Sequence, residues 1–175
     1  MVEHGFKIYV FVQNNLLEGK VPAGVIGSEF IYFCHVENNF LTGTLPPFTG
    51  NSSRLASMKF FNNFITGTIP PSYGYLDNMR NFILNYNHLT GTIPVELARL
   101  EKLAVLSVKF NYLTGSLARE FCDLTSLESL ILGSNRFTGT LDLILQNVNN
   151  MTKLSQLDFS GKNILRYHIV TFTCV

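Results

Sequence analysis

The stretch Asn87-His88-Leu89-Thr90-Gly91-Thr92-Ile93-Pro94 recurs along the chain with a fixed period. Its leading asparagine returns after every 24 residues, at Asn15, Asn39, Asn63, Asn87, Asn111 and Asn135. A constant period of roughly 20–50 residues predicts a solenoid, in which each repeat forms one coil and buries its apolar side chains against its neighbours. We therefore expect one elongated repeat domain.

A short strand precedes each asparagine. In the fifth copy, Leu106 and Val108 alternate with Val105, Ser107 and Lys109, and this period of two indicates a strand with one buried face. The corresponding inward pairs of the other copies are Val10/Val12, Cys34/Val36, Met58/Phe60, Phe82/Leu84 and Leu130/Leu132. Stacking the copies would continue each apolar column from one coil into the next.

The asparagine, glycine and proline of the repeat have structural roles. An asparagine amide has donors and an acceptor, so it can satisfy the backbone where the chain turns after the strand and link neighbouring copies. Gly91 and its equivalents permit backbone angles that a Cβ forbids. Pro94 ends a strand and can open a helical turn, which we expect over residues 95–100 with Leu97 and Leu100 inward.

This pattern resembles the plant-type leucine-rich repeat, whose unit reads roughly LxxLxxLxLxxNxLxGxIP. Residues 100–117 fit it well, although Ala118 stands where the final proline would be, and the resemblance covers about residues 7–165. LTGTLP-type repeats of protist surface antigens look equally similar. The resemblance implies an α/β repeat fold, a right-handed solenoid with a concave parallel sheet, short second strands, and 3₁₀ or short helical turns on its convex side.

The predicted repeat domain spans residues 1–165, with about six regular repeats and one degenerate repeat, followed by a non-repeat tail at 166–175. Plant-type repeats usually carry paired-cysteine caps, and this sequence shows none. Because solenoid ends need polar caps, further repeats or caps are expected beyond the given sequence.

The seventh copy departs from the period. If Leu154, Leu157 and Phe159 form its strand, its asparagine position falls at Lys162, 27 residues after Asn135. The seventh turn then loses its asparagine, unless Asn163 shifts into that position. We expect the three extra residues in the convex segment 143–152.

Composition excludes several functional classes. The formal net charge is +1, which suggests no nucleic-acid binding, and charged residues make up only 14%. The sequence has no signal peptide at its start and no apolar run long enough to span a membrane. The resemblance implies an extracellular or cell-surface location, and Asn51 and Asn150 head possible glycosylation sequons.

The outward strand residues are the candidate ligand-binding surface. Aromatic side chains converge on the first three copies, with polar groups around them, which is the anatomy of interface hot spots. The predicted ligand-binding residues are Tyr9, Phe11, Phe33, His35, Glu37, Lys59, Phe61, Asn85, Tyr86, Lys109 and Phe110. Alternatively, aromatic residues stand there because they suit strands, or because upstream repeats pack on them.

A second surface suggests a different function. Hydroxyl residues flank the glycine in five successive copies, at Thr42/Thr44, Thr66/Thr68, Thr90/Thr92, Thr114/Ser116 and Thr138/Thr140. Two parallel files of this kind resemble ice-binding surfaces on other solenoids. The alternative function is therefore an ice-binding or adhesive protein, although serine or threonine is ordinary at these positions of the repeat.

The sequence contains no catalytic constellation, no phosphate-binding glycine loop and no zinc-ligand spacing, so we expect no enzyme activity, cofactor or metal. Three cysteines also argue against a disulfide framework. The favoured prediction is a recognition module that binds a protein, peptide or glycan on the concave sheet. It would be part of a receptor-like or surface protein, or an inhibitor of cell-wall hydrolases.

Overall fold

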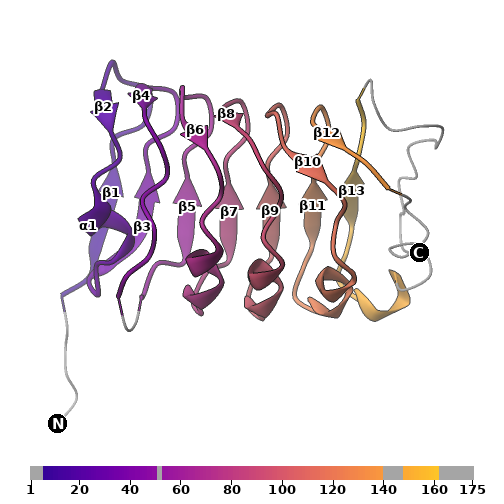
Figure 1. The fold of residues 1–175 in the computed structure, drawn as a ribbon. Helices are drawn as coiled ribbons and strands as arrows, with labels where there is room; N and C mark the ends of the chain where they lie inside the picture. The colour runs from indigo at the N-terminus through magenta and orange to yellow at the C-terminus, as the bar shows by residue number, and fades with distance from the viewer. Residues whose placement is uncertain (1–5, 51–52, 140–147, 162–175) are drawn as a thin grey trace, which may run out of the picture.

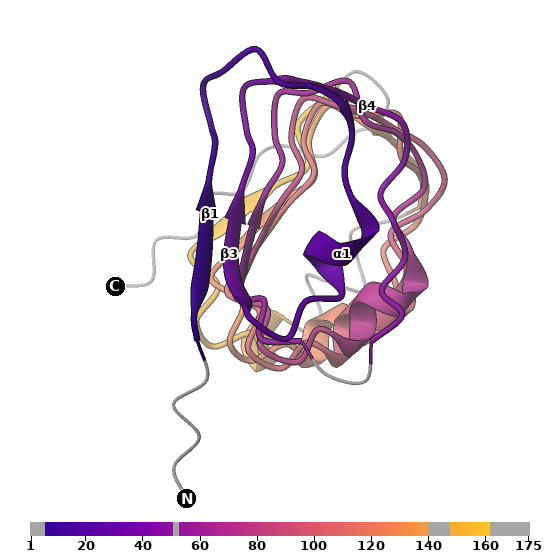
Figure 2. The ribbon, with the colours of Figure 1, turned by 90° about the vertical axis from the view of Figure 1, so that its left-hand side faces the viewer.

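The chain forms a right-handed solenoid in this computed structural model, which describes residues 6–50, 53–139 and 148–161. In Figure 1 each coil rises through a strand at the back, crosses the top, descends at the front and returns below to the next coil. Figure 2, viewed from the side of β1, shows the coils behind one another around a common core. The predicted fold class is confirmed.

The main sheet has seven parallel strands, in the order β1-β3-β5-β7-β9-β11-β13. Their bounds are Ile8–Phe11, Ile31–His35, Ser57–Lys59, Asn81–Ile83, Val105–Ser107, Ser129–Ile131 and Gln156–Asp158. Adjacent strands pair one period apart, as in Phe82 with Leu106 and Leu106 with Leu130. The sequence period therefore sets the register of the sheet directly.

A second set of short strands lies at the front of the solenoid in Figure 1, after each turn. Their bounds are Glu18–Lys20 for β2, Phe40–Thr42 for β4, Thr66–Gly67 for β6, His88–Leu89 for β8, Thr114–Gly115 for β10 and Arg136–Phe137 for β12. They pair as β2 with β4, β6 with β8 and β10 with β12. These second strands match the expectation drawn from the repeat resemblance.

Helical turns close the lower side of the coils. They are α1 (Ala23–Ile26) and the 3₁₀ turns η1 (Pro71–Tyr75), η2 (Val95–Arg99), η3 (Arg119–Asp123) and η4 (Val148–Asn150). Pro94 precedes η2 with extended backbone at φ −62°, and Leu97 and Leu100 are buried, so the predicted turn over residues 95–100 is confirmed.

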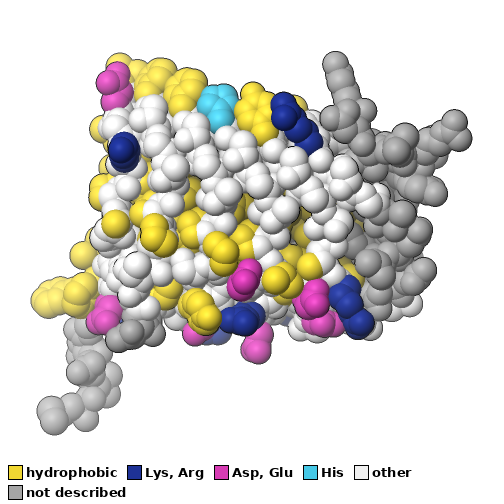
Figure 3. Space-filling model, in the orientation of Figure 1, with side chains coloured by type: hydrophobic (Ala, Val, Ile, Leu, Met, Phe, Trp, Pro, Cys, Tyr) yellow, Lys and Arg dark blue, Asp and Glu magenta, His cyan; other side chains and the backbone are white. Residues whose placement is uncertain are grey.

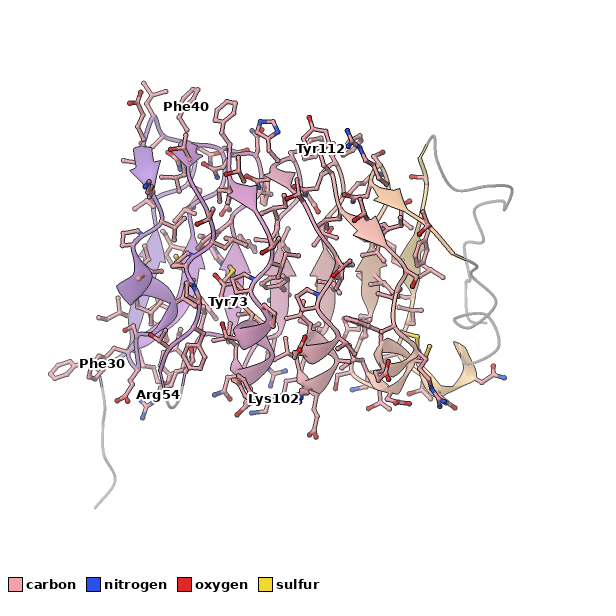
Figure 4. All side chains as sticks on the ribbon, in the orientation of Figure 1. Phe30, Phe40, Arg54, Tyr73, Lys102 and Tyr112 are labelled. Atoms are coloured by element: carbon pink, nitrogen blue, oxygen red, sulfur yellow. The ribbon has the colours of Figure 1, made fainter. Side chains whose placement is uncertain are left out.

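The core is a stack of apolar columns that runs the length of the solenoid. The inward strand residues from Met58 to Leu132 are all buried, whereas Val10 and Val12 of the first coil are only partly buried. Tyr73 lies inside the coil in Figure 4, where its hydroxyl donates to the Pro46 carbonyl oxygen at 2.9 Å. Its ring also packs edge-on against Phe82.

The asparagines join successive coils through their side-chain amides. Asn111 Nδ2 donates to the carbonyl oxygen of Leu84 in the preceding coil at 3.0 Å, and to that of Val108 in its own coil at 3.0 Å. Its Oδ1 accepts from the Leu89 N–H at 3.0 Å. The same pattern recurs at Asn39, Asn63, Asn87 and Asn135.

Gly91 and Gly115 are required by both backbone angle and space. Both have a φ of +78°, a region that residues with a Cβ rarely adopt. A Cβ on Gly115 would lie 2.8 Å from the Cγ2 methyl of Thr92 in the preceding coil. The glycine of one coil thus receives the threonine of the coil before it.

The seventh coil departs from the period as expected. Leu130 pairs with Leu157, which is 27 residues later, and the predicted strand around Leu157 is present as β13. Part of the predicted insertion, the predicted asparagine position at Lys162 or Asn163, the domain end at residue 165 and the tail at 166–175 lie outside the described residues.

The asparagine ladder gives a direct test of coil coupling. Replacing the buried Asn111 with alanine should lower the free energy of unfolding by about 2–4 kcal/mol, because the buried Leu89 N–H loses its acceptor. Asn15 is the matched control, since it is exposed and bonds only within its own coil, to the Val12 and Gln13 carbonyls. Asn15→Ala should cost less than about 1 kcal/mol. Equal losses in denaturant unfolding would contradict this role.

Candidate ligand-binding surface

Four aromatic rings cluster on the outward face of β1 and β3. The Tyr9 and Phe33 ring centroids lie 5.2 Å apart, those of Phe11 and His35 5.0 Å apart, and those of Phe33 and His35 5.8 Å apart. Tyr9 is 48% exposed and Phe11 53% exposed. We refer to Tyr9, Phe11, Phe33 and His35 as the aromatic cluster. The structure brings these four predicted site residues together.

Tyr32 extends the aromatic cluster, and the sequence analysis missed it. Its ring centroid lies 6.1 Å from that of Tyr9, and the Lys7 ammonium lies 5.2 Å from its centroid. Arg54 Nη1 donates to the Tyr32 hydroxyl at 3.4 Å. Tyr32 precedes the alternating part of the strand, so the period of two did not assign it to the outward face.

His35 is held by the next coil. Its Nε2 lies 2.9 Å from Ser57 Oγ, which buries Ser57 although it belongs to an outward column. Burial lowers the pKa of His35, the Lys59 ammonium lowers it further, and the Glu37 carboxylate opposes both. The imidazole is therefore mostly neutral at pH 7, below which its ordinary pKa of 6.5 already lies.

Glu37 lies in the predicted outward column but is not an exposed rim residue. It is only 8% exposed, and its Oε2 atom has no hydrogen-bond partner among the described residues. The Oε1 atom of Gln13, in the same column one coil earlier, is also buried without a partner. Lys59 and Phe61, in the next coil, are half-buried. Residue type and spacing alone did not indicate that this carboxylate is covered.

Asn85 and Lys109 belong to a second polar group further along the sheet. Asn85 Oδ1 accepts from Ser107 Oγ at 2.7 Å and from the Lys109 N–H at 2.9 Å. Lys109 Nζ forms an ion pair with Asp158 Oδ2 at 2.8 Å, reaching across the sixth coil. That coil presents Gly133, where a Cβ would come within 2.9 Å of Asp158 Oδ1. This group fastens the seventh coil to the fifth.

Tyr86 and Phe110 lie apart from the aromatic cluster. Their φ values are +53° and +55°, and their rings stack with centroids 4.4 Å apart. Both line a groove of about 670 Å³ along the edge of the solenoid, together with the asparagine ladder, Phe40, Phe64 and Tyr112. Phe110 also borders the polar group, because the Lys109 ammonium lies 5.3 Å from its ring centroid.

The outer wall of this groove is a continuous row of rings that we call the edge row. Centroids lie 5.9 Å apart from Phe40 to Phe64, 5.9 Å from Phe64 to His88 and 5.8 Å from His88 to Tyr112. The row runs along the upper edge in Figure 3, and Phe40 and Tyr112 mark it in Figure 4. The signal was the 24-residue spacing of these residues, which occupy a position treated as variable.

The threonine files have structural contacts of their own. Thr66 Oγ1 donates to the Gly43 carbonyl oxygen at 3.0 Å, and Thr90 and Thr114 make the equivalent bond to Gly67 and Gly91. The second file supplies the methyl groups that face the next glycine, as Thr92 faces Gly115. Both files therefore help to join coils, whether or not they bind anything.

The described part of the chain offers no other evident chemical centre. No group of three or more histidine, cysteine, aspartate or glutamate side chains among these residues can hold a metal ion. Burial, assisted by the Glu37 charge, raises the pKa of the Cys34 thiol to about 12. No helix among the described residues has the length and apolar character needed to cross a membrane.

Comparisons with known proteins agree with this fold. Residues 77–137 match the family model described as leucine rich repeat. The ectodomain of the plant membrane receptor kinase GASSHO1/SCHENGEN3 from Arabidopsis thaliana is 30% identical with a TM-score of 0.81, over 88% of this chain and 18% of that one. No curated protein sequence matches significantly.

Two further receptor structures are similarly close. The plant peptide hormone receptor RGFR1 is 29% identical with a TM-score of 0.78, over 86% of this chain and 24% of that one. A TDR receptor is 29% identical with a TM-score of 0.76, over 85% and 25%. The chain thus spans about a fifth to a quarter of the structures it matches. It is a leucine-rich repeat protein of the plant type.

The ion pair between Lys109 and Asp158 predicts a pH dependence of stability. Burial raises the pKa of Asp158, but hydrogen bonds from Lys109 and Ser160 outweigh it and hold the pKa below its ordinary value of 3.8. A carboxylate with a lowered pKa in the folded state stabilises the fold above its unfolded pKa, and this contribution is lost as the pH falls through the folded pKa.

Asp158→Asn should therefore unfold more easily than the natural chain at neutral pH, by less than about 1 kcal/mol. The difference should shrink as the pH falls below the ordinary aspartate pKa of 3.8. Denaturant unfolding across this pH range measures it, with the exposed Asp77→Asn as control. A difference that stays constant down to strong acid would contradict the assignment.

Proposed function

We propose that this chain is a non-catalytic recognition module that binds a protein or peptide on its concave sheet. The observation that carries the proposal is the aromatic cluster, in which Tyr9 and Phe11 remain about half exposed although they pack on Phe33 and His35. Exposed aromatic side chains held rigidly by neighbours offer large contact areas at little entropic cost, which is the property of interface hot spots.

The dimensions of the sheet suit an extended peptide or a loop of a partner protein. Seven strands at about 4.8 Å spacing make a surface about 30 Å wide. The aromatic cluster occupies the first two coils, and Lys59 and Phe61 continue the surface into the third. A partner that crosses the strands can thus contact the rings first and the Asn85–Lys109 group further along.

The comparisons support an interaction role. RGFR1 is a peptide hormone receptor whose structure holds RGF2, and the GASSHO1/SCHENGEN3 ectodomain is in complex with CASPARIAN STRIP INTEGRITY FACTOR 2. The chain covers a fraction of such ectodomains, so we place it within a larger receptor-like or surface protein, outside the cell. The comparisons offer no support for the ice-binding alternative.

Selection of binders from a phage-displayed library of random linear peptides tests the location of the site. Peptides selected on the natural chain should lose affinity by about tenfold or more on a Phe33→Ala/Phe61→Ala variant, because these truncations remove part of the aromatic surface. The matched control is Phe64→Ala/Tyr112→Ala, which removes two rings of the edge row and should leave affinity unchanged.

The opposite pattern would overturn the proposed site. Peptides that bind the concave variant normally, or that depend on the edge row, would place recognition elsewhere. A panel of immobilised plant and microbial glycans provides the remaining arm. Concave-dependent glycan binding without any concave-dependent peptide would contradict the proposal of a protein or peptide ligand.

The proposed extracellular location makes a separate prediction for Asn150. This residue is exposed at the end of η4 and heads the triplet Asn150-Met151-Thr152. Secretion of the chain through a eukaryotic host should therefore attach an N-glycan at Asn150, and mass spectrometry of the peptide before and after glycosidase treatment would detect it. Thr152→Ala should abolish the modification. An unmodified Asn150 in secreted protein would count against glycosylation at this position.

A further inference from the structure

Two buried acceptor atoms lie without donors beside the aromatic cluster. They are Oε2 of Glu37 and Oε1 of Gln13, and neither has a hydrogen-bond partner among the described residues. Burying a carboxylate without a counter-charge costs several kcal/mol, roughly, and native folds rarely leave such a group unpaired. The two residues occupy the same outward column on adjacent coils, where the Asn14 N–H donates to the Glu37 carbonyl oxygen.

No cation of the described chain neutralises Glu37. The ion pair of Lys109 with Asp158 is the single one within 4.0 Å among the described residues, so the Lys59 ammonium lies beyond that distance from the Glu37 carboxylate. The imidazole of His35 is engaged with Ser57 Oγ, and its lowered pKa keeps it mostly neutral at pH 7. The carboxylate thus keeps an unmet demand for positively charged donors.

The surroundings of this carboxylate suit a flat cation. Phe11 and His35 stand directly opposite each other on β1 and β3, two residues before Gln13 and Glu37. Phe61 follows Glu37 in the same column on the third coil. Aromatic faces attract cations, and a guanidinium group also stacks on them.

We propose that Glu37 and Gln13 form a subsite for an arginine side chain of the ligand, which rests on the proposed function of the concave sheet. A guanidinium group carries five donors in one plane, so it can donate to acceptors from two residues at once while its face lies against a ring. A lysine ammonium supplies the charge but not the plane, and it binds less tightly.

Access requires a small movement at the first coil. The orphan oxygens are covered in the ligand-free chain, and Gln13 is only partly buried, so rotation of its side chain opens the way to Glu37. Changes of side-chain rotamer of this size are common on binding. The arginine therefore replaces the cover that Gln13 provides.

A double-mutant cycle on a selected peptide tests the subsite. The probe is a peptide from the random display library whose binding is lost on Phe33→Ala/Phe61→Ala, made with arginine and again with citrulline, its neutral analogue. Replacing arginine by citrulline should weaken binding to the natural chain by about tenfold or more and binding to Glu37→Gln hardly at all. Glu101→Gln, an exposed carboxylate on the helical side, should behave as the natural chain.

The outcomes separate this inference from the proposed function. If no selected peptide depends on Phe33 and Phe61, the proposed function fails. If peptides depend on these residues but show no enrichment of arginine, or if citrulline costs the same on Glu37→Gln as on the natural chain, the recognition surface stands and the arginine subsite is overturned.

Stability without ligand gives an independent readout. Glu37→Gln replaces an unpaired buried carboxylate by a neutral amide, so the ligand-free variant should melt at the same temperature as the natural chain or higher. A residue kept for structure would behave oppositely. A clearly lower melting temperature for Glu37→Gln, with Glu101→Gln unchanged, would show that Glu37 supports the fold and would overturn its assignment to the ligand.

Discussion

The hydrogen bonds of one buried asparagine to the coil before it hold this structure together. A single coil cannot enclose a core, because its strand, second strand and 3₁₀ turn surround only a thin layer of apolar side chains. The amide of Asn111 bonds the backbone of Leu84 and Leu89 in the preceding coil while it also bonds its own turn. Each turn is thereby fixed to its neighbour at one height, and the apolar columns line up as a consequence.

That constraint explains where recognition can reside. Asparagine, glycine, proline and the inward residues have partners within the stack, and even the threonine files donate to the preceding coil. The outward strand residues are free to vary, and they differ most in the first three coils. The aromatic cluster and the unpartnered Glu37 carboxylate occur there together, whereas Lys109 and Asp158 neutralise each other further along.

Much of the fold could be predicted because the period fixes the register. The alternation around Leu106 and Val108 identified the buried face, and Pro94 marked the start of a 3₁₀ turn. The even spacing also located the seventh strand despite its 27-residue offset. These features depend on local patterns that repeat, so a single sequence was sufficient.

The candidate site was less predictable, because it depends on contacts between coils. Nothing in the sequence showed that Glu37 would be covered, or that Gly133 would let Lys109 reach Asp158. Tyr86 and Phe110 adopt the left-handed backbone that asparagine holds at the same position in earlier coils, and they line the edge groove. The edge row itself became visible only when the coils were stacked.

The central claim is that the first three coils of the concave sheet form the recognition surface. Amide chemical shifts of the isotopically labelled chain, followed by NMR during titration with a display-selected peptide, test this most directly because no residue has to be altered. The account predicts that the largest changes fall on β1, β3 and β5, at Phe33, His35 and Phe61. Changes concentrated on the second strands or along the edge row, with the main sheet unaffected, would contradict it.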